Sequence, residues 1–387
     1  MHISVALLFS VAVVGGTLSR DDQKVKNPKK IKIQEGPVSS SVIDRNLVTE
    51  EPQIKDILSH YKSYFEDTKK KNFKGHLLGY VTPWNNHGYN VAKIFAAKFD
   101  FISPVWLQIS REGQNKFSVS GKHDVDKGWM KEVKKNSALK VKVIPRLLFE
   151  NWGQDDLLRL SSSESERKAL ANAIIKVAEN MQFDGVVLEL WSQLAGRIKN
   201  KVLIDLILFI SRRLKENELV TFLVIPPYQG DTPGSFSKEQ FDVLAENIDG
   251  FSLMTYDFSS PQRPGPNSPL QWAMDCVIEL VPNDNDPLRS KIFLGINFYG
   301  NDYTPNGGSP IVNNQYISLL KNAKGRLRYD NMSAEHMVEV KTDSGRHLVF
   351  YPTLHSIQKR IELAEDLGTG IAIWELGQGL DYFYDLF

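Results

Sequence analysis

A carboxylate and an indole stand two residues apart in an apolar run from Phe183 to Gln193, which reads Phe-Asp-Gly-Val-Val-Leu-Glu-Leu-Trp-Ser-Gln. A short run of this kind is typical of a buried parallel strand. Because side chains alternate along a strand, Glu189 and Trp191 should share one face and Asp184 the other. Parallel α/β folds keep their ligands at the carboxyl ends of the strands. We therefore expect Glu189 and Trp191 at a ligand site, whereas Asp184 should fix a connection between strands.

Aromatic side chains recur at or near the ends of other predicted strands. They are Trp84, Trp106, Tyr256 and Trp374, and Asp257 follows Tyr256 directly. The flat C–H face of a sugar ring packs on an indole, and burial of ~100 Å² contributes roughly 2.5 kcal/mol at about 25 cal/mol/Å². Any one of these rings could equally be a core residue. Together with Trp191 they indicate a carbohydrate-binding rim.

Strands and helices alternate along most of the chain. The predicted strands are 77–84, 99–108, 141–149, 183–193, 219–225, 248–257, 291–300 and 370–375, and the predicted helices are 52–66, 127–138, 164–181, 201–217, 238–247, 270–281 and 355–367. Eight β/α steps predict a (β/α)₈ TIM barrel rather than an open doubly wound sheet. No Gly-x-Gly-x-x-Gly follows a strand, which argues against a dinucleotide cofactor. Residues 301–353 contain short alternating runs around an Asp-Ser-Gly turn, which predicts a small β-rich insertion after strand seven.

Composition excludes several classes of function. The chain has 387 residues, 42% of them hydrophobic and 24% charged, with a formal net charge of +1. This balance is typical of a globular protein with a sizeable core and argues against nucleic acid as a partner. The eight His residues form no metal-binding motif, so no metal site and no cofactor are expected. The single cysteine, Cys276, lies in an apolar helical pattern and should be a buried thiol.

The N-terminal region has the features of a secreted protein. Residues 1–19 are predicted to be a signal peptide, because the apolar run 3–14 is too short to span a bilayer and small residues follow it. Residues 20–50 are Lys-rich and predict a flexible basic arm, with a polybasic tether as the alternative. The barrel should then cover 51–387. The sequon at Asn331 would accept a glycan in the secretory route. Secretion is expected, with retention in a lysosome or late endosome as the alternative.

The run from Asp184 resembles the strand-four signature of glycoside hydrolase family 18, the chitinase family, which reads Asp-Gly-x-Asp-x-Asp-x-Glu. Asp184 and Gly185 match, Val187 replaces the second acid, Glu189 replaces the third, and Trp191 stands at the position of the proton-donating glutamate. The run Met-Thr-Tyr-Asp at 254–257 matches the strand-six motif, and the tryptophan at 374 matches the one that floors the sugar. The resemblance covers about residues 75–387.

The resemblance implies an altered chemistry. In active members the strand-four glutamate protonates the leaving glycosidic oxygen, and the N-acetyl group of the sugar is the nucleophile. An indole cannot replace that acid, and Glu189 would lie roughly 6–7 Å further down the strand. Glu189 could also be a buried carboxylate satisfied by Tyr256 or Asp257, and Trp191 could fill the site rather than extend it. No catalytic residue is therefore expected.

The family resemblance implies a secreted, catalytically inactive lectin for N-acetylglucosamine-type oligosaccharides or bacterial glycoconjugates such as lipopolysaccharide. The residues expected to contact sugar are Trp84, Trp106, Glu189, Trp191, Tyr256, Asp257 and Trp374. Within the family the chain resembles a divergent branch that interacts with the receptor stabilin-1. The alternatives are therefore a protein-interaction scaffold for that receptor, and a residual glycosidase that uses Glu189.

Overall fold

The computed structural model describes residues 31–387 except 139, 229, 231 and 233. The predicted signal peptide and residues 20–30 of the predicted arm lie outside the described residues. Residues 33–387 form one compact unit. No helix in the described ranges is long and apolar enough to cross a membrane.

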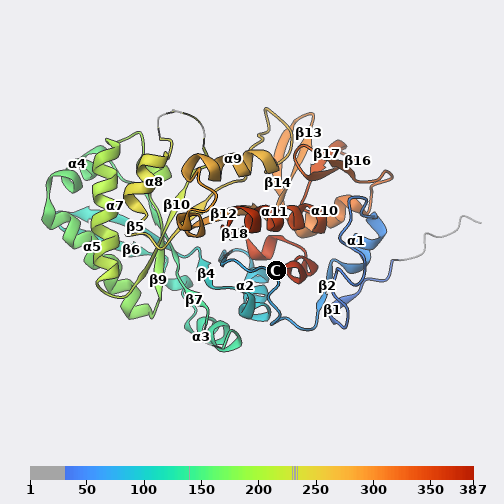
Figure 1. Cartoon of the computed structure of the whole chain (residues 1–387), viewed down its shortest axis with the longest axis horizontal. Coiled ribbons are helices and arrows are strands. Elements are labelled where there is room, and N and C mark those ends of the chain that lie inside the picture. The colour runs from blue at the N-terminus through green and yellow to red at the C-terminus, as the bar shows by residue number, and fades with distance from the viewer. Residues whose placement is uncertain (1–30, 139, 229, 231, 233) are drawn as a thin grey trace, which may run out of the picture. The chain divides into compact units, whose positions relative to one another are not determined.

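A mainly parallel 11-stranded sheet forms the centre of this unit (Figure 1). The strands that make the barrel wall are β3 (Leu77–Val81), β4 (Phe101–Pro104), β7 (Lys142–Val143), β8 (Arg146–Phe149), β9 (Gly185–Glu189), β10 (Val220–Ile225), β11 (Gly250–Leu253), β12 (Ile292–Asn297) and β18 (Gly370–Trp374). The hairpin β5 (Leu107–Gly113) and β6 (Lys116–Ser120) extends the sheet beside β8.

The sheet closes on itself through the third barrel strand, which is interrupted and consists of β7 and β8. Its order is β6-β5-β8-β9-β10-β11-β12-β18-β3-β4-β7, so β7 and β8 lie toward opposite ends although only two residues separate them. Ile144 donates its N–H to the carbonyl of Ile102 in β4 (2.9 Å), while the Pro145 carbonyl accepts from the Val187 N–H of β9 (2.9 Å). Pro145 has no N–H, and the strand is interrupted there. The closed parallel sheet confirms the predicted TIM-barrel fold.

Helices surround the barrel at most of the predicted places. They are α2 (Asn86–Ile94), α3 (Lys127–Asn136), α4 (Gln154–Ser162), α5 (Glu164–Met181), α7 (Asn200–Lys215), α8 (Lys238–Leu244), α9 (Leu270–Leu280) and α11 (Leu354–Leu367). The sequence prediction missed α2, α4 and the single turn α6 (Trp191–Leu194). Cys276 on α9 is buried, as predicted, and burial raises the pKa of its thiol to about 11.

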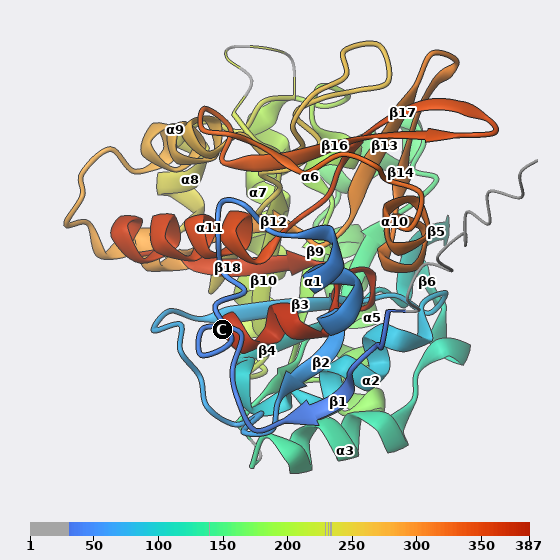
Figure 2. The same cartoon turned by 90° about the vertical axis from the view of Figure 1, so that its right-hand side faces the viewer.

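The insertion after β12 is a five-stranded antiparallel sheet, as the short alternating runs predicted (Figure 2). Its order is β14-β13-β17-β16-β15, with bounds β13 (Gly300–Thr304), β14 (Gly307–Ile311), β15 (Arg328–Asp330), β16 (Glu335–Thr342) and β17 (Gly345–Phe350). Helix α10 (Asn313–Leu320) connects β14 to β15.

The prediction of a flexible arm was wrong for the residues from Glu35 onward. Strand β1 (Glu35–Val38) pairs in parallel with β2 (Lys62–Phe65), and β2 occupies the end of the stretch predicted as helix 52–66, of which only α1 (Ile54–His60) is helical. Val42 is fully buried, and its N–H donates to Asp385 Oδ2 at 3.2 Å. Asp385 Oδ1 accepts from the Phe65 N–H at 2.7 Å. One C-terminal carboxylate thus holds two N-terminal segments, a contact that no local pattern indicates.

Candidate functional site

A cavity of about 460 Å³ lies at the carboxyl ends of the barrel strands, and we call it the rim cavity. It is lined by Tyr80, Arg146, Glu189, Val224, Met254, Tyr256, Asp257, Tyr299, Pro310, Val312, Trp374 and Gln378. Most of these residues end a barrel strand or follow one, whereas Pro310 and Val312 come from the insertion. The insertion therefore supplies one wall of the cavity.

Glu189 enters the cavity from the last position of β9 and forms an ion pair with Arg146. Arg146 Nη1 donates to Glu189 Oε2 at 2.8 Å, and their side chains are only 13% and 19% exposed. Arg146 pairs in register with Val187 on the neighbouring β9, so the two charged side chains come from adjacent strands. The partner of Glu189 is thus Arg146, and the expectation of Tyr256 or Asp257 as its partner was wrong. Both charges are shielded from water, so each depends on the other for compensation.

Three tyrosines add hydroxyl groups to the cavity. Tyr80 donates to Ser252 Oγ at 2.8 Å, and Tyr299 donates to the carboxylate of Asp257. Burial raises the pKa of Tyr256 well above its usual value, so its phenol stays protonated. A protonated phenol can donate a hydrogen bond as well as accept one. The cavity therefore presents both donors and acceptors to a polar ligand.

Trp374 closes β18 and lies at the edge of the cavity, partly exposed. Its ring lies 5.2 Å from that of Tyr80, with the planes tilted by 51°. A cis peptide bond joins it to Glu375. Glu375 is fully buried and accepts hydrogen bonds from Asn85 Nδ2 at 2.9 Å and from the Gly377 N–H at 3.0 Å. Burial raises the pKa of Glu375 to about 7.

Trp191 does not line the cavity, so its prediction as a sugar contact was wrong. Strand β9 ends at Glu189, and Leu190 (φ −129°, ψ −26°) leaves the extended conformation. The strict alternation of faces therefore stops before Trp191, which begins α6 and is fully buried. Its indole N–H donates to the Gly234 carbonyl at 3.0 Å, and its ring packs edge-on against Phe236 at 4.8 Å.

The other two predicted tryptophans also lie outside the cavity. Trp106 is fully buried between β4 and β5, and its indole N–H donates to the Tyr89 hydroxyl at 2.6 Å. Trp84 lies beyond the end of β3, is 71% exposed and is not among the lining residues. Burial therefore contradicts the prediction for Trp106, whereas the sugar contact of Trp84 stays a prediction. Glu189, Tyr256, Asp257 and Trp374 are brought together as expected.

Asp184 takes the structural role that its strand parity predicted. Its carboxylate accepts from Lys134 Nζ at 2.9 Å and from the Val143 N–H at 2.7 Å, which ties β9 to α3 and β7.

The model of the family described as glycosyl hydrolases family 18 matches residues 76–379. The chain belongs to glycosyl hydrolase family 18.

Several solved structures share the fold at low sequence identity. A chitinase from Chromobacterium violaceum is 21% identical, with 81% of this chain and 98% of that chain covered and a TM-score of 0.69. The spore cortex-lytic enzyme SleL from Bacillus megaterium is 20% identical, with coverage of 80% and 72% and a TM-score of 0.67. A chitinase from Cycas revoluta, solved in complex with (GlcNAc)₃, is 14% identical, with coverage of 80% and 98% and a TM-score of 0.66.

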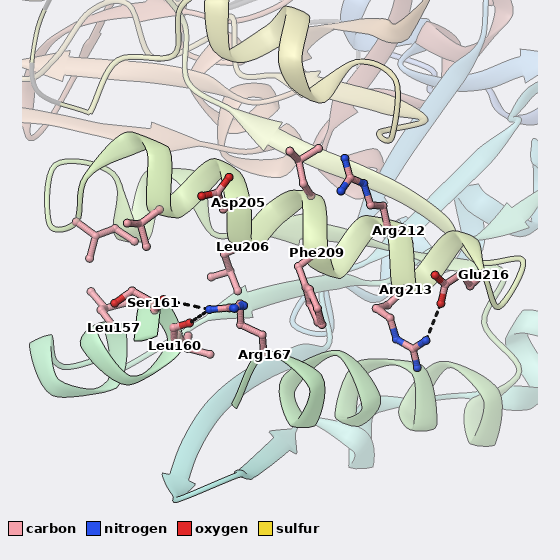
Figure 3. Close-up of a pocket in the computed structure, with 13 residues that line it drawn as sticks. Leu157, Leu160, Ser161, Arg167, Asp205, Leu206, Phe209, Arg212, Arg213 and Glu216 are labelled. Carbon is pink, nitrogen blue, oxygen red and sulfur yellow. Dashed lines mark hydrogen bonds and ion pairs between the residues drawn. The ribbon is translucent and has the colours of Figure 1, made fainter. Parts of the chain in front are cut away.

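A second cavity of about 460 Å³ lies on the outside of this family 18 barrel, against α4, α5 and α7 (Figure 3). None of its lining residues belongs to a strand. Arg167 donates to the carbonyls of Leu160 and Ser161, and Arg213 pairs with Glu216. Two of the three arginines in this outer cavity are thus engaged in bonds within the protein. The rim cavity is the better candidate for the functional site, because it combines aromatic and polar groups at the functional end of a barrel.

Three cavity residues were not predicted from the sequence: Tyr80, Arg146 and Tyr299. All three lie within stretches that were predicted to be strands, so a signal was available. Alternation along the predicted strand 141–149 puts Arg146 on one face with Ile144, but the register with the strand that contains Glu189 decides that the two charges meet.

Proposed function

We propose that this family 18 protein is a secreted, catalytically inactive lectin that binds N-acetylglucosamine-type oligosaccharides, or bacterial glycoconjugates with acylated glucosamine, in the rim cavity. The observation that carries the proposal is the composition of that cavity. It presents Trp374 and three tyrosines, while its Glu189 is held by Arg146. The arrangement favours binding of a sugar over cleavage of it.

The binding half of the proposal rests on shape and polarity. A volume of about 460 Å³ falls within the usual range for small-ligand pockets. The partly exposed indole of Trp374 offers an apolar face for a sugar ring, and Tyr256 and Asp257 offer a donor and an acceptor beside it. The (GlcNAc)₃ complex of the Cycas revoluta chitinase supports the choice of sugar class.

The absence of catalysis is proposed because neither of the two candidate acids is placed to donate a proton. By the resemblance, Trp191 stands at the position of the general acid, and its indole N–H is engaged with the Gly234 carbonyl. Glu189 accepts a hydrogen bond from a guanidinium, and a carboxylate in that role is an acceptor rather than a proton donor. A residual glycosidase that uses Glu189 remains the alternative for this site.

The finer identity and location are also part of the proposal. We assign the chain to the divergent branch of the family called chitinase domain-containing protein. Members of that branch interact with the receptor stabilin-1. The alternative function is therefore a protein-interaction scaffold for that receptor. Secretion, with retention in a lysosome or late endosome as its alternative, follows from the N-terminal sequence. The side chain of Asn331 is exposed, which suits a glycan at its sequon.

Titration of chitooligosaccharides of increasing length against tryptophan fluorescence tests the proposal. We expect saturable quenching that tightens with length. Trp374→Ala should abolish it, because removal of roughly 2.5 kcal/mol of ring packing corresponds to about a 60-fold loss of affinity. Trp84→Ala is the matched control, since Trp84 is 71% exposed and lies outside the cavity, and it should bind like the parent. Absence of quenching at every length would contradict the lectin and favour the receptor scaffold.

A hydrolysis assay separates the lectin from the residual glycosidase. The parent protein should release no fluorophore from a methylumbelliferyl chitobioside. Release that is lost in Glu189→Gln but kept in Trp191→Phe would show that the glycosidase is the correct reading.

A further inference from the structure

A serine, a histidine and an aspartate form a connected chain in the insertion, at the hairpin between β16 and β17. Ser344 Oγ lies 3.1 Å from His347 Nε2, and His347 Nδ1 lies 2.8 and 3.0 Å from the two carboxylate oxygens of Asp302. Asp302 is on β13, His347 is on β17 and Ser344 is in the turn before it. These strands lie side by side in the sheet of the insertion (Figure 2).

The hydrogen bonds constrain the direction of this chain. A carboxylate only accepts, so His347 Nδ1 carries a proton, and in the neutral ring Nε2 is then an acceptor. Thr342 Oγ1 lies 2.7 Å from Ser344 Oγ, 2.9 Å from His347 Nε2 and accepts from the Ser344 N–H at 3.2 Å. Two assignments fit the hydroxyl groups: Ser344 donates to His347 directly, or Ser344 donates to Thr342 and Thr342 donates to His347. In both, Nε2 is the base toward which the hydroxyl proton of Ser344 passes, either directly or through Thr342.

Exposure distinguishes the roles of these groups. The side chains of His347 and Asp302 are only 10% and 13% exposed, so the base and its orienting carboxylate are held in place. Ser344 is exposed, which leaves its hydroxyl open to a reactant, and Thr342 is partly buried and already accepts a backbone N–H. A nucleophile, a base that contacts it and a group that orients the base are the parts of a hydrolytic triad.

A cavity of about 720 Å³ adjoins the triad, with His347 in its wall. Three cationic side chains line it: Lys324, Lys341 and Arg346. Within the described ranges these three form no ion pair, so their charge is available to a ligand. Lys341 and Arg346 pair across the hairpin, on the opposite face from His347, so their charge adjoins the cavity rather than the acyl group. The cavity shares no lining residue with the rim cavity.

We propose that Ser344, His347 and Asp302 form a second active site, which hydrolyses carboxylic esters that carry a negative charge. Ser344 Oγ bonds to the acyl carbon while its proton passes to His347 Nε2. The ester C–O bond breaks, and the leaving alkoxide takes that proton from His347. Water then attacks the acyl-serine, gives a proton to His347 and releases the carboxylic acid, and Ser344 regains its proton. The net reaction consumes one water and yields one acid and one alcohol.

Labelling of the full-length protein with a fluorophosphonate probe, followed by peptide mass spectrometry, tests the proposal. The probe should modify Ser344, and p-nitrophenyl succinate should be hydrolysed faster than p-nitrophenyl acetate. Ser344→Ala should remove labelling and lower turnover on the order of 10²-fold or more. Asp343→Asn is the matched control, because Asp343 is exposed in the same turn and lies outside both the triad and the cavity lining, and it should keep at least half of both signals.

A purely structural hydrogen-bond network gives a different pattern. In that case the probe would leave Ser344 unmodified, or His347→Gln would label as fast as the parent, and either result overturns the proposal. Arg346→Met should remove the preference for the succinate ester while labelling of Ser344 continues. An unchanged preference would overturn the assignment of a negatively charged substrate.

Discussion

Replacement of Glu375 by Gln should change the pH dependence of stability. Burial raises the pKa of this carboxyl to about 7 from an ordinary value of 4.5, so the native state keeps its proton over a range in which the unfolded chain has lost it. A group of this kind stabilises the fold fully below about pH 4.5, and its contribution falls as the pH rises through 7. At roughly 1.4 kcal/mol per pH unit, the loss amounts to about 3 kcal/mol.

Urea unfolding of the parent and of Glu375→Gln at a series of pH values measures this effect. The difference in unfolding free energy, parent minus variant, should fall by about 3 kcal/mol between about pH 4 and pH 8. The difference is used because other groups titrate as well. Burial lowers the pKa of His336 to about 4, so this ring costs stability as the pH falls through 6.5, the opposite direction.

Glu365→Gln supplies the matched control, since that side chain is exposed on α11. Its difference curve should be flat. A Glu375→Gln curve that is also flat, or that rises with pH, would refute the reasoning that burial of Glu375 dominates its titration.

Two further predictions concern the framework of the barrel. Arg360 is buried and donates hydrogen bonds to three loop carbonyls and to Glu335. Urea titrations should show that Arg360→Met lowers the unfolding free energy by about 3–5 kcal/mol. The control Lys359→Met should change it by less than about 1 kcal/mol. A loss in Arg360→Met no larger than that of Lys359→Met would contradict this. A Cβ at Gly185 would lie 2.0 Å from a carbonyl of the neighbouring strand, so Gly185→Ala should cost about 3 kcal/mol or more, while Gly325→Ala, in open space, should be neutral by the same measurement. Equal stability of the two alanine variants would show that β9 can shift.

Much of the fold follows from local patterns. Apolar runs and helical periodicity predicted the barrel strands and most of the helices, because each buries a face that its own sequence encodes. Asp184 was assigned correctly for the same reason, since strand parity decides its face.

The errors have three physical causes. The prediction for Trp191 assumed that alternation continues beyond Glu189, but the backbone turns at Leu190, and tertiary packing around α6 decides that turn. Trp106 was misplaced because a strand end and a buried connection have the same apolar composition. The N-terminal segment was misjudged because its partner, Asp385, lies at the other end of the sequence. Contacts of that range leave no local signal.

The pairing of β3 with β18 has a consequence for how the protein is made. The first strand of the barrel meets its second neighbour only when residues 370–374 have been synthesised. At a synthesis rate of about 5–20 residues per second, tens of seconds pass between the synthesis of β3 and the synthesis of β18. During that time β3 has an open edge, and such edges attract other strands. We expect the nascent chain to depend on a chaperone over this interval, and a truncation before β18 would leave the edge open permanently.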